Sequence, residues 1–133
     1  MVSFVTLLGR ILLALIFIMS GISKIGGYAG TIAYMQGHGI PAAPFFLYVA
    51  VLVELGGGLS IATGFRARIG ALVLVAFLIP TTYLFHMKPA FDAAFNVVDK
   101  LQLIEALKNL GLIGGLLMIY GNGAGKLTIG KDS

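Results

Sequence analysis

The chain has 133 residues, of which 59% are hydrophobic and only 11% charged, and its mean hydropathy is +1.02. A water-soluble domain usually carries about a quarter charged residues, and a small one keeps too much of its surface in water to hide so many apolar side chains. The composition therefore excludes an ordinary soluble domain and predicts a protein embedded in a lipid bilayer.

The net charge of +4 and the absence of cysteine exclude further classes of function. Lys and Arg stand mainly at the ends of apolar runs, a pattern typical of membrane orientation and not of a nucleic-acid-binding patch. We therefore expect a lipid bilayer, and no nucleic acid, as partner. Without cysteine, the chain forms no disulfide, exchanges no thiols and offers no thiolate to an iron–sulfur cluster.

Four apolar segments follow one another, at about residues 4–22, 44–63, 69–86 and 101–120. A spanning helix needs about 20 mostly apolar residues. The pattern predicts an all-α polytopic membrane protein, a single domain over residues 1–133 that forms a four-transmembrane-helix bundle. The first segment carries Arg10 and is followed by no small-residue cleavage site, so we expect it to remain as a span and not to act as a removable signal peptide.

The connections between the segments differ in length. Residues 24–43 are rich in glycine and polar residues and are predicted to form a long connection. Residues 86–100 form a second one, in which Phe91, Phe95 and Val98 share one helical face, a spacing that predicts a short amphipathic helix in the membrane interface. Residues 64–68 are predicted to form a tight turn.

Basic residues beside the spans predict the orientation, because cytoplasmic loops carry an excess of Lys and Arg. The side shared by both termini has Arg66, Arg68, Lys126 and Lys131, and the other side has Lys24, Lys88 and Lys100. We therefore expect both termini to be cytoplasmic and the two longer loops to be extracytoplasmic.

Ionisable residues interrupt three of the four segments. A charge at the centre of a spanning helix costs about 3 kcal/mol on insertion scales, so such residues face one another or line a polar cavity. We expect a buried Arg10–Glu54 ion pair, joined by Lys108 and Asn109 in an intramembrane polar network. Glu105 is expected near the outer headgroups. The network can serve a functional site or only fix which helices meet, and the sequence leaves both interpretations open.

A candidate ligand pocket is predicted around the third segment. Pro80 removes one helical hydrogen bond and should bend the helix. Thr82, Tyr83 and His86 follow within two turns and offer polar groups beside the bend. Lys24, at the end of the first segment, is the further candidate for this pocket. A proline that is merely tolerated, with its neighbours hydrogen-bonded to their own helix, is the alternative.

The two histidines could in principle be ligands of a metal ion or a haem. His38 and His86 lack the spacing of a ligand set, and no cysteine assists them. Isolated histidines near an interface are usually only hydrogen-bonded, so we expect no metal site.

Several ordered motifs resemble one family. They are residues 8–10, 17–28 (FIMSGISKIGGY), 34–41 (YMQGHGIP), 53–58 (VELGGG), 64–66 (GFR), 85–86 (FH) and 108–115 (KNLGLIGG). Together they cover nearly the whole chain and resemble the DoxX family of small four-helix bacterial inner-membrane proteins. The resemblance implies an inner (plasma) membrane location. Some members resemble the membrane subunit of thiosulfate:quinone oxidoreductase, and others are associated with oxidative-stress complexes. It implies no established catalytic residues.

Three functions stay open, and with them whether the chain is an enzyme. The first is a quinone-associated redox or oxidative-stress component, in which Lys108, Asn109 and His86 donate to a quinone carbonyl and a redox partner protein supplies electrons. The second is a non-enzymatic scaffold or anchor that recruits partners through loop aromatics such as Tyr28 and Tyr34. The third is a small transporter or lipid-handling protein, for which four helices would suffice only as a homodimer. No cofactor is established by the sequence, and quinone is the candidate.

Overall fold

The computed structural model of the chain describes residues 2–91, 94, 96–97 and 99–128, and within them the architecture is helical. The elements are α1 (Val2–Gly26), α2 (Tyr28–Gly37), α3 (Ala43–Thr63), α4 (Ala67–Thr82), the π-helical turn η1 (Tyr83–Met87), α5 (Lys88–Ala90) and α6 (Lys100–Asn122).

Four helical rods in the described part of the chain are long and apolar enough to cross a membrane: Ser3–Gly26, Ala43–Thr63, Ala67–Ala90 and Lys100–Asn122. Each predicted segment lies inside one of them, which confirms the all-α, four-span architecture. In an apolar stretch of 18 residues within each span, only 17% to 33% of the residues are buried by the rest of the protein. The remaining apolar surface is suited to lipid, which is as apolar as the side chains themselves.

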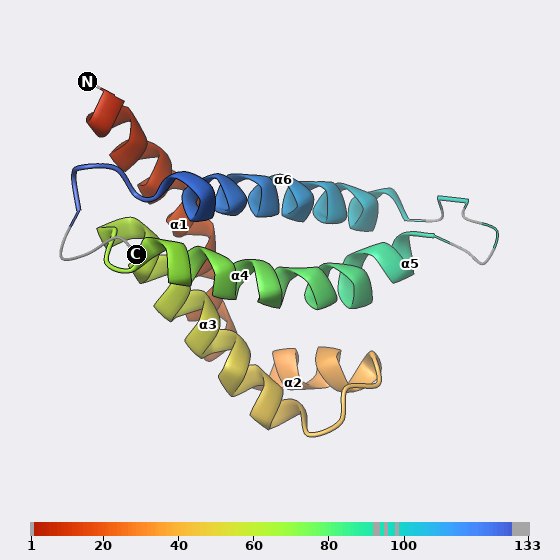
Figure 1. The fold of residues 1–133 in the computed structure, drawn as a ribbon. Helices are drawn as coiled ribbons and strands as arrows, with labels where there is room; N and C mark the ends of the chain where they lie inside the picture. The colour runs from red at the N-terminus through yellow and green to blue at the C-terminus, as the bar shows by residue number, and fades with distance from the viewer. Residues whose placement is uncertain (1, 92–93, 95, 98, 129–133) are drawn as a thin grey trace.

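The spans pack in the order α1, α3, α4, α6 (Figure 1). Helix α3 lies between α1 and α4, and α6 lies along the other side of α4. The first turns of α1 and the last turns of α6 lie at the same end of the bundle, as an even number of crossings requires. We call this the terminal end, which includes the turn at residues 64–66. The opposite end, with α2, η1 and α5, is the loop end.

A hydrophobic core joins the four spans. It contains Ala14, Phe17, Ile61, Ala71, Leu74, Val75, Leu78 and Leu116. Glycines set the distances between the helices around it. A Cβ atom at Gly57 would lie 2.6 Å from Cγ of Leu74, and one at Gly21 would lie 2.8 Å from Cγ of Leu55. The two glycines therefore allow α4 and α1 to approach α3 closely, as small residues do in membrane bundles.

The tight turn predicted at residues 64–68 is confirmed. Helix α3 ends at Thr63 and α4 begins at Ala67. Gly64 (φ 80°) and Arg66 (φ 51°) both adopt the left-handed conformation. The Ser60 hydroxyl donates to the carbonyl oxygens of Phe65 and Arg66, at 2.7 and 3.1 Å. These bonds fix the backbone between the two spans.

The two long connections differ from expectation. Residues 28–37 form a helix, α2, which the sequence interpretation did not include. The predicted interfacial helix is wrong, because Phe91 is extended and pairs with Val97 in an isolated antiparallel bridge. Phe95 and Val98 lie outside the described residues. The Asp99 carboxylate accepts from the Gln102 N–H at 3.1 Å and caps α6, so that a new helix begins at Lys100.

Candidate functional site

A cavity of about 660 Å³ lies among α2, the N-terminal half of α3, and the part of the third span that runs from Phe77 to His86. Its lining is mostly apolar: Met35, Ile40, Pro41, Phe46, Val49, Ala50, Phe77, Pro80, Leu84 and Phe85. Five polar side chains complete it: Lys24, Thr31, Tyr34, Thr81 and His86. Figure 1 shows why the space exists, since α3 diverges from α4 toward the loop end and α2 lies beside the diverging half.

An ion pair between Lys24 and Glu54 stands at the α1 side of this cavity. Lys24 Nζ lies 2.7 Å from Glu54 Oε1 and also donates to Ser20 Oγ at 2.8 Å. The Glu54 side chain is only 5% exposed, whereas that of Lys24 is 28% exposed and lines the cavity. The contact is an ion pair and not an aligned hydrogen bond. A buried carboxylate requires such a cation, because an unpaired charge away from water is costly.

The helices determine this pairing. Gly21 carries no side chain, so the side chains of Leu55 and Glu54 on α3 can lie against the last turns of α1. Lys24 lies in the last turn of α1, where the helix dipole favours a cation. The ammonium group has three donors. Ser20 accepts one of them and Glu54 lies against the charge, so the group retains donor capacity for a ligand in the cavity.

His86 supplies the second polar group of defined orientation. It lies in η1, and its Nδ1 is 2.7 Å from Gln102 Oε1 of α6. Because an amide oxygen only accepts, this contact places the proton of a neutral imidazole on Nδ1 and leaves Nε2 as an acceptor. The hydroxyl of Thr81 donates to the Phe77 carbonyl oxygen at 2.7 Å, beside Pro80, so the helix hydrogen-bonds itself and also walls the cavity. π-Helical turns of this kind are frequent at functional sites.

Aromatic rings close the cavity toward the loop end. The Tyr34 ring stacks on Phe85, with centroids 5.3 Å apart and planes inclined by 25°. His38 contacts both rings, at 4.4 and 4.9 Å, and its Nδ1 lies 2.9 Å from the Tyr34 carbonyl oxygen. Tyr34 thus forms part of the cavity wall. The sequence had instead predicted an aromatic residue in a loop that recruits partner proteins.

The predicted Arg10–Glu54 ion pair is wrong. Arg10 is 2% exposed, and its guanidinium donates to the carbonyl oxygens of Ile61 (3.1 Å), Ala62 (3.4 Å) and Leu127. The antiparallel register of α1 and α3 places Glu54 opposite Gly21, eleven residues or about 16 Å along the helix from Arg10. Arg10 therefore joins α1 to the end of α3 and to the C-terminal tail.

The fourth span does not join a common polar network either. Lys108 faces outward, its side chain 42% exposed, and pairs with Glu105 at 2.6 Å on the same helix. The Asn109 amide is buried and donates to Thr82 Oγ1 at 3.0 Å across the α4–α6 interface. Neither Thr82 nor the exposed Tyr83 lines the cavity. The sequence-predicted candidates that the structure brings together at the cavity are Lys24 and His86.

Sequence reasoning missed the contribution of α2. Thr31, Tyr34 and Met35 line the cavity, and His38 packs on Tyr34. Their spacing of i, i+3, i+4 and i+7 marks one helical face. That spacing was a signal of a helix in a segment that its glycines made look like a loop. Gln102, which orients His86, carried no signal of its own.

Within the described residues, no group of three or more His, Asp or Glu side chains could hold a metal ion. The cavity instead combines a large apolar lining with one cationic donor and one imidazole acceptor. Such a lining can bind a mainly apolar molecule and orient it through polar atoms.

These features define the class: a polytopic helical membrane protein with a ligand-sized cavity beside a buried ion pair. Residues 5–87 match the DoxX family, and the chain belongs to it. The chain is 38% identical to "Inner membrane protein YqjF" of Escherichia coli (strain K12), over 94% of this chain and 88% of the relative. It is 28% identical to "Inner membrane protein YphA" of the same organism, over 94% and 87%.

A third relative is the Bacillus subtilis (strain 168) protein named "Putative oxidoreductase CatD", 34% identical over 82% of this chain and 78% of the relative. No solved structure matches the chain. The relatives and the four apolar helices identify an integral, multi-pass inner-membrane protein.

Proposed function

We propose that this protein is the quinone-binding component of a membrane oxidoreductase system. The observation that carries the proposal is the cavity of about 660 Å³, apolar over most of its wall, with Lys24 and His86 on that wall. Ligand cavities in proteins have volumes of about 300–1,000 Å³ and a few placed polar groups. A quinone is a lipid-soluble molecule with a flat apolar ring and two oxygens, which matches this lining.

The side chains of the cavity would hold the two oxygens. Lys24 has a remaining N–H that can donate to a carbonyl oxygen, and Glu54 behind it balances the ammonium charge. His86 Nε2 can accept a hydrogen bond from the hydroxyl of the reduced form, since Gln102 holds the proton on Nδ1. Tyr34 and Phe85 offer ring faces at the loop end. A bound quinone supplies two-electron redox chemistry, and the electrons come from a redox partner protein.

One relative supports this class of function. The B. subtilis protein bears the name "Putative oxidoreductase CatD" and aligns with most of this chain. The ion pair beside the cavity adds to that support, because ionisable residues within spans are expensive and mark ligand or proton pathways.

Quinone binding by purified protein in lipid nanodiscs tests the proposal, with a short-chain ubiquinone and a short-chain menaquinone as probes. We expect saturable binding of at least one of them. Lys24→Gln removes the ammonium donor but leaves an amide to partner Glu54. A hydrogen bond from a charged group is worth about 1.5–3 kcal/mol, so the affinity should fall about ten-fold or more.

Lys108→Gln is the matched control. It neutralises a second lysine that is also paired with a glutamate, at 2.6 Å, but that faces away from the cavity. Quinone affinity should be unchanged. Absence of saturable binding, or equal loss in the two variants, would reject the proposed site.

We propose further that both termini are cytoplasmic. The terminal end carries Arg66, Arg68 and Lys126, and cytoplasmic ends are rich in basic residues. Alkaline phosphatase, which is active only outside the cytoplasm, should be inactive when fused after residue 128 and active when inserted in the connection at residues 38–42. The reverse pattern would invert the topology.

A further inference from the structure

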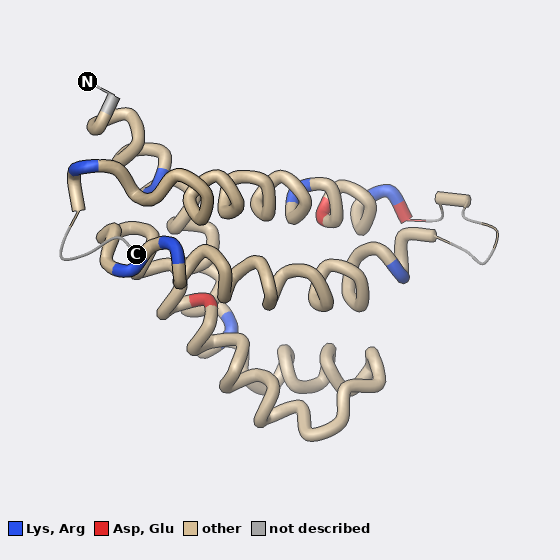
Figure 2. Tube along the Cα trace, viewed as in Figure 1, with Lys and Arg blue, Asp and Glu red and all other residues tan. Residues whose placement is uncertain are grey.

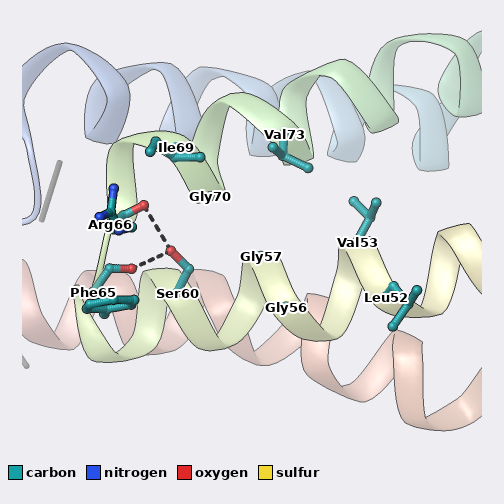
Figure 3. Close-up of a pocket in the computed structure, with 10 residues that line it drawn as sticks. All are labelled: Leu52, Val53, Gly56, Gly57, Ser60, Phe65, Arg66, Ile69, Gly70 and Val73. Carbon is teal, nitrogen blue, oxygen red and sulfur yellow. Dashed lines mark hydrogen bonds between the residues drawn. The ribbon is translucent and has the colours of Figure 1, made fainter.

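A second hollow lies on the outside of the bundle, along α3 and α4 at the terminal end. It measures about 390 Å³ (Figure 3). Gly56, Gly57 and Gly70 form its floor, and aliphatic side chains such as Val53 and Val73 form its walls. Phe65 and Arg66 close it at the turn. It is separate from the cavity proposed for quinone and shares no lining residue with it.

The three glycines leave the floor of the groove without side chains, and they do so for two different reasons. Gly57 is required by packing, since a Cβ there would overlap Leu74, and a Cβ at Gly70 would overlap Ser60. A Cβ at Gly56 would meet nothing within 4 Å. The groove is therefore a by-product of close helix packing on one side and is open toward the bilayer on the other. Hydrocarbon must fill it, because an empty groove would forfeit the dispersion contacts of its lining.

Arg66 gives the groove a charged end. Its backbone is held in the left-handed conformation, with its carbonyl oxygen fixed by Ser60, and its guanidinium lies 5.8 Å from the centroid of the Phe65 ring. The ion pairs found among the described residues are Lys24–Glu54 and Lys108–Glu105, neither of which involves Arg66. Figure 2 shows several basic segments at this end, and both basic and acidic segments further along the bundle. Arg66 therefore places a cation at the end of an apolar groove, where an anionic group can pair with it.

We infer that the groove binds an anionic phospholipid, with one acyl chain along the glycine floor and the phosphate on Arg66. An arginine matches a phosphate with two parallel hydrogen bonds. The first N–H groups of α4 add to this, because Arg66 precedes the helix without a side-chain cap. Basic pockets between spans recognise anionic headgroups in this way.

Charge argues against a second copy of this chain as the occupant. A two-fold axis along the membrane normal would bring two Arg66 side chains to the same depth at the same interface. Like charges facing each other oppose association. An anionic lipid satisfies both the apolar groove and its cationic end.

The chain contains no tryptophan, so Phe65→Trp introduces a single reporter at the charged end of the groove. In nanodiscs, its fluorescence is quenched by lipids with brominated chains. We expect brominated phosphatidylglycerol to quench with about five-fold higher apparent affinity than brominated phosphatidylcholine, the ratio that about 1 kcal/mol per basic residue gives.

Two pairs of variants in the Phe65→Trp background locate the lipid. Arg66→Asn, which suits a left-handed residue, should abolish the preference for phosphatidylglycerol, and Arg68→Gln, a neighbouring arginine outside the groove, should keep it. Gly56→Leu should fill the floor and weaken quenching by both lipids. Gly114→Leu adds the same volume at another open glycine and should not.

Equal quenching by the two lipids would overturn the inference, as would a preference that survives Arg66→Asn. Weak quenching by both lipids, together with a dimer that Gly56→Leu dissociates, would overturn it in favour of a second copy. None of these outcomes depends on whether the other cavity binds quinone.

Discussion

The two ends of the bundle each contain a buried charge, and the two charges are satisfied differently. At the terminal end, backbone carbonyl oxygens of α3 and of the C-terminal tail surround Arg10. Toward the loop end, Glu54 pairs with Lys24, which also lines a cavity. Burial alone therefore does not mark a functional site. A charge surrounded by the protein's own backbone holds the fold together, whereas one paired at a cavity wall can act on a ligand.

The largest expected effect comes from Lys24→Met. It leaves Glu54 buried without its cation, which costs about 3–5 kcal/mol. The matched variant Lys108→Met breaks an exposed pair and should cost about 0.5 kcal/mol or less. Helicity followed by circular dichroism during unfolding in mixed micelles measures both.

The double variant Lys24→Met/Glu54→Leu separates the structural from the functional part of that effect. Replacing a whole buried ion pair by apolar residues is often neutral or stabilising, so most of the stability should return. Quinone binding should stay lost. If the double variant binds quinone like the unchanged protein, Lys24 is not the donor.

Arg10→Met tests the other end. The carbonyl oxygens of Ile61, Ala62 and Leu127 lose their donor, and we expect a loss of about 2–3 kcal/mol. The quinone affinity of the folded fraction should not change, because Arg10 does not line the cavity. Arg68→Met, at an exposed position, should change neither the free energy of unfolding nor the quinone affinity. If Arg10→Met lowered the quinone affinity as much as Lys24→Gln, the distinction between a structural charge at one end and a ligand-binding charge at the other would be wrong.

The four spans could be predicted from the sequence because hydropathy over about 20 residues is a property of each segment alone. The pairing of charges could not. It depends on the register between α1 and α3, which Gly21 and Gly58 set through close contacts with the facing helix. The prediction of an Arg10–Glu54 pair rests on placing both residues at the centre of their helices. The actual register keeps the two residues apart.

Two further differences have local causes. The glycine-rich sequence of α2 favoured the prediction of a loop instead of a helix. The helix forms part of the cavity wall because it packs on α3, a contact that local sequence does not reveal. The Lys108–Glu105 pair was readable as an i, i+3 pair on one helix face. The cost of a charge in lipid favours an interior position for Lys108, but the neighbouring Glu105 carboxylate lowers that cost at the surface.

Glycine packing gives a smaller effect. Gly57→Ala places a methyl group against Leu74 and should cost about 2 kcal/mol by overpacking. Gly56→Ala, one residue earlier and facing open space, should cost nothing measurable. The same unfolding measurement compares them. Equal losses in the two variants would contradict the α3–α4 contact as the reason for Gly57, because alanine itself favours the helix over glycine.

The smallest effects distinguish two adjacent threonines. Thr82→Val removes the acceptor of the buried Asn109 amide and should cost about 1 kcal/mol without changing quinone affinity, because Thr82 faces α6. Thr81→Val should barely alter stability, since the Phe77 carbonyl keeps its helical N–H bond. Thr81 lines the cavity, however, so its loss should change quinone affinity by a few-fold. Unfolding and binding curves for the two variants check this, and a reversed pattern would place the ligand between α4 and α6 instead of between α3 and α4.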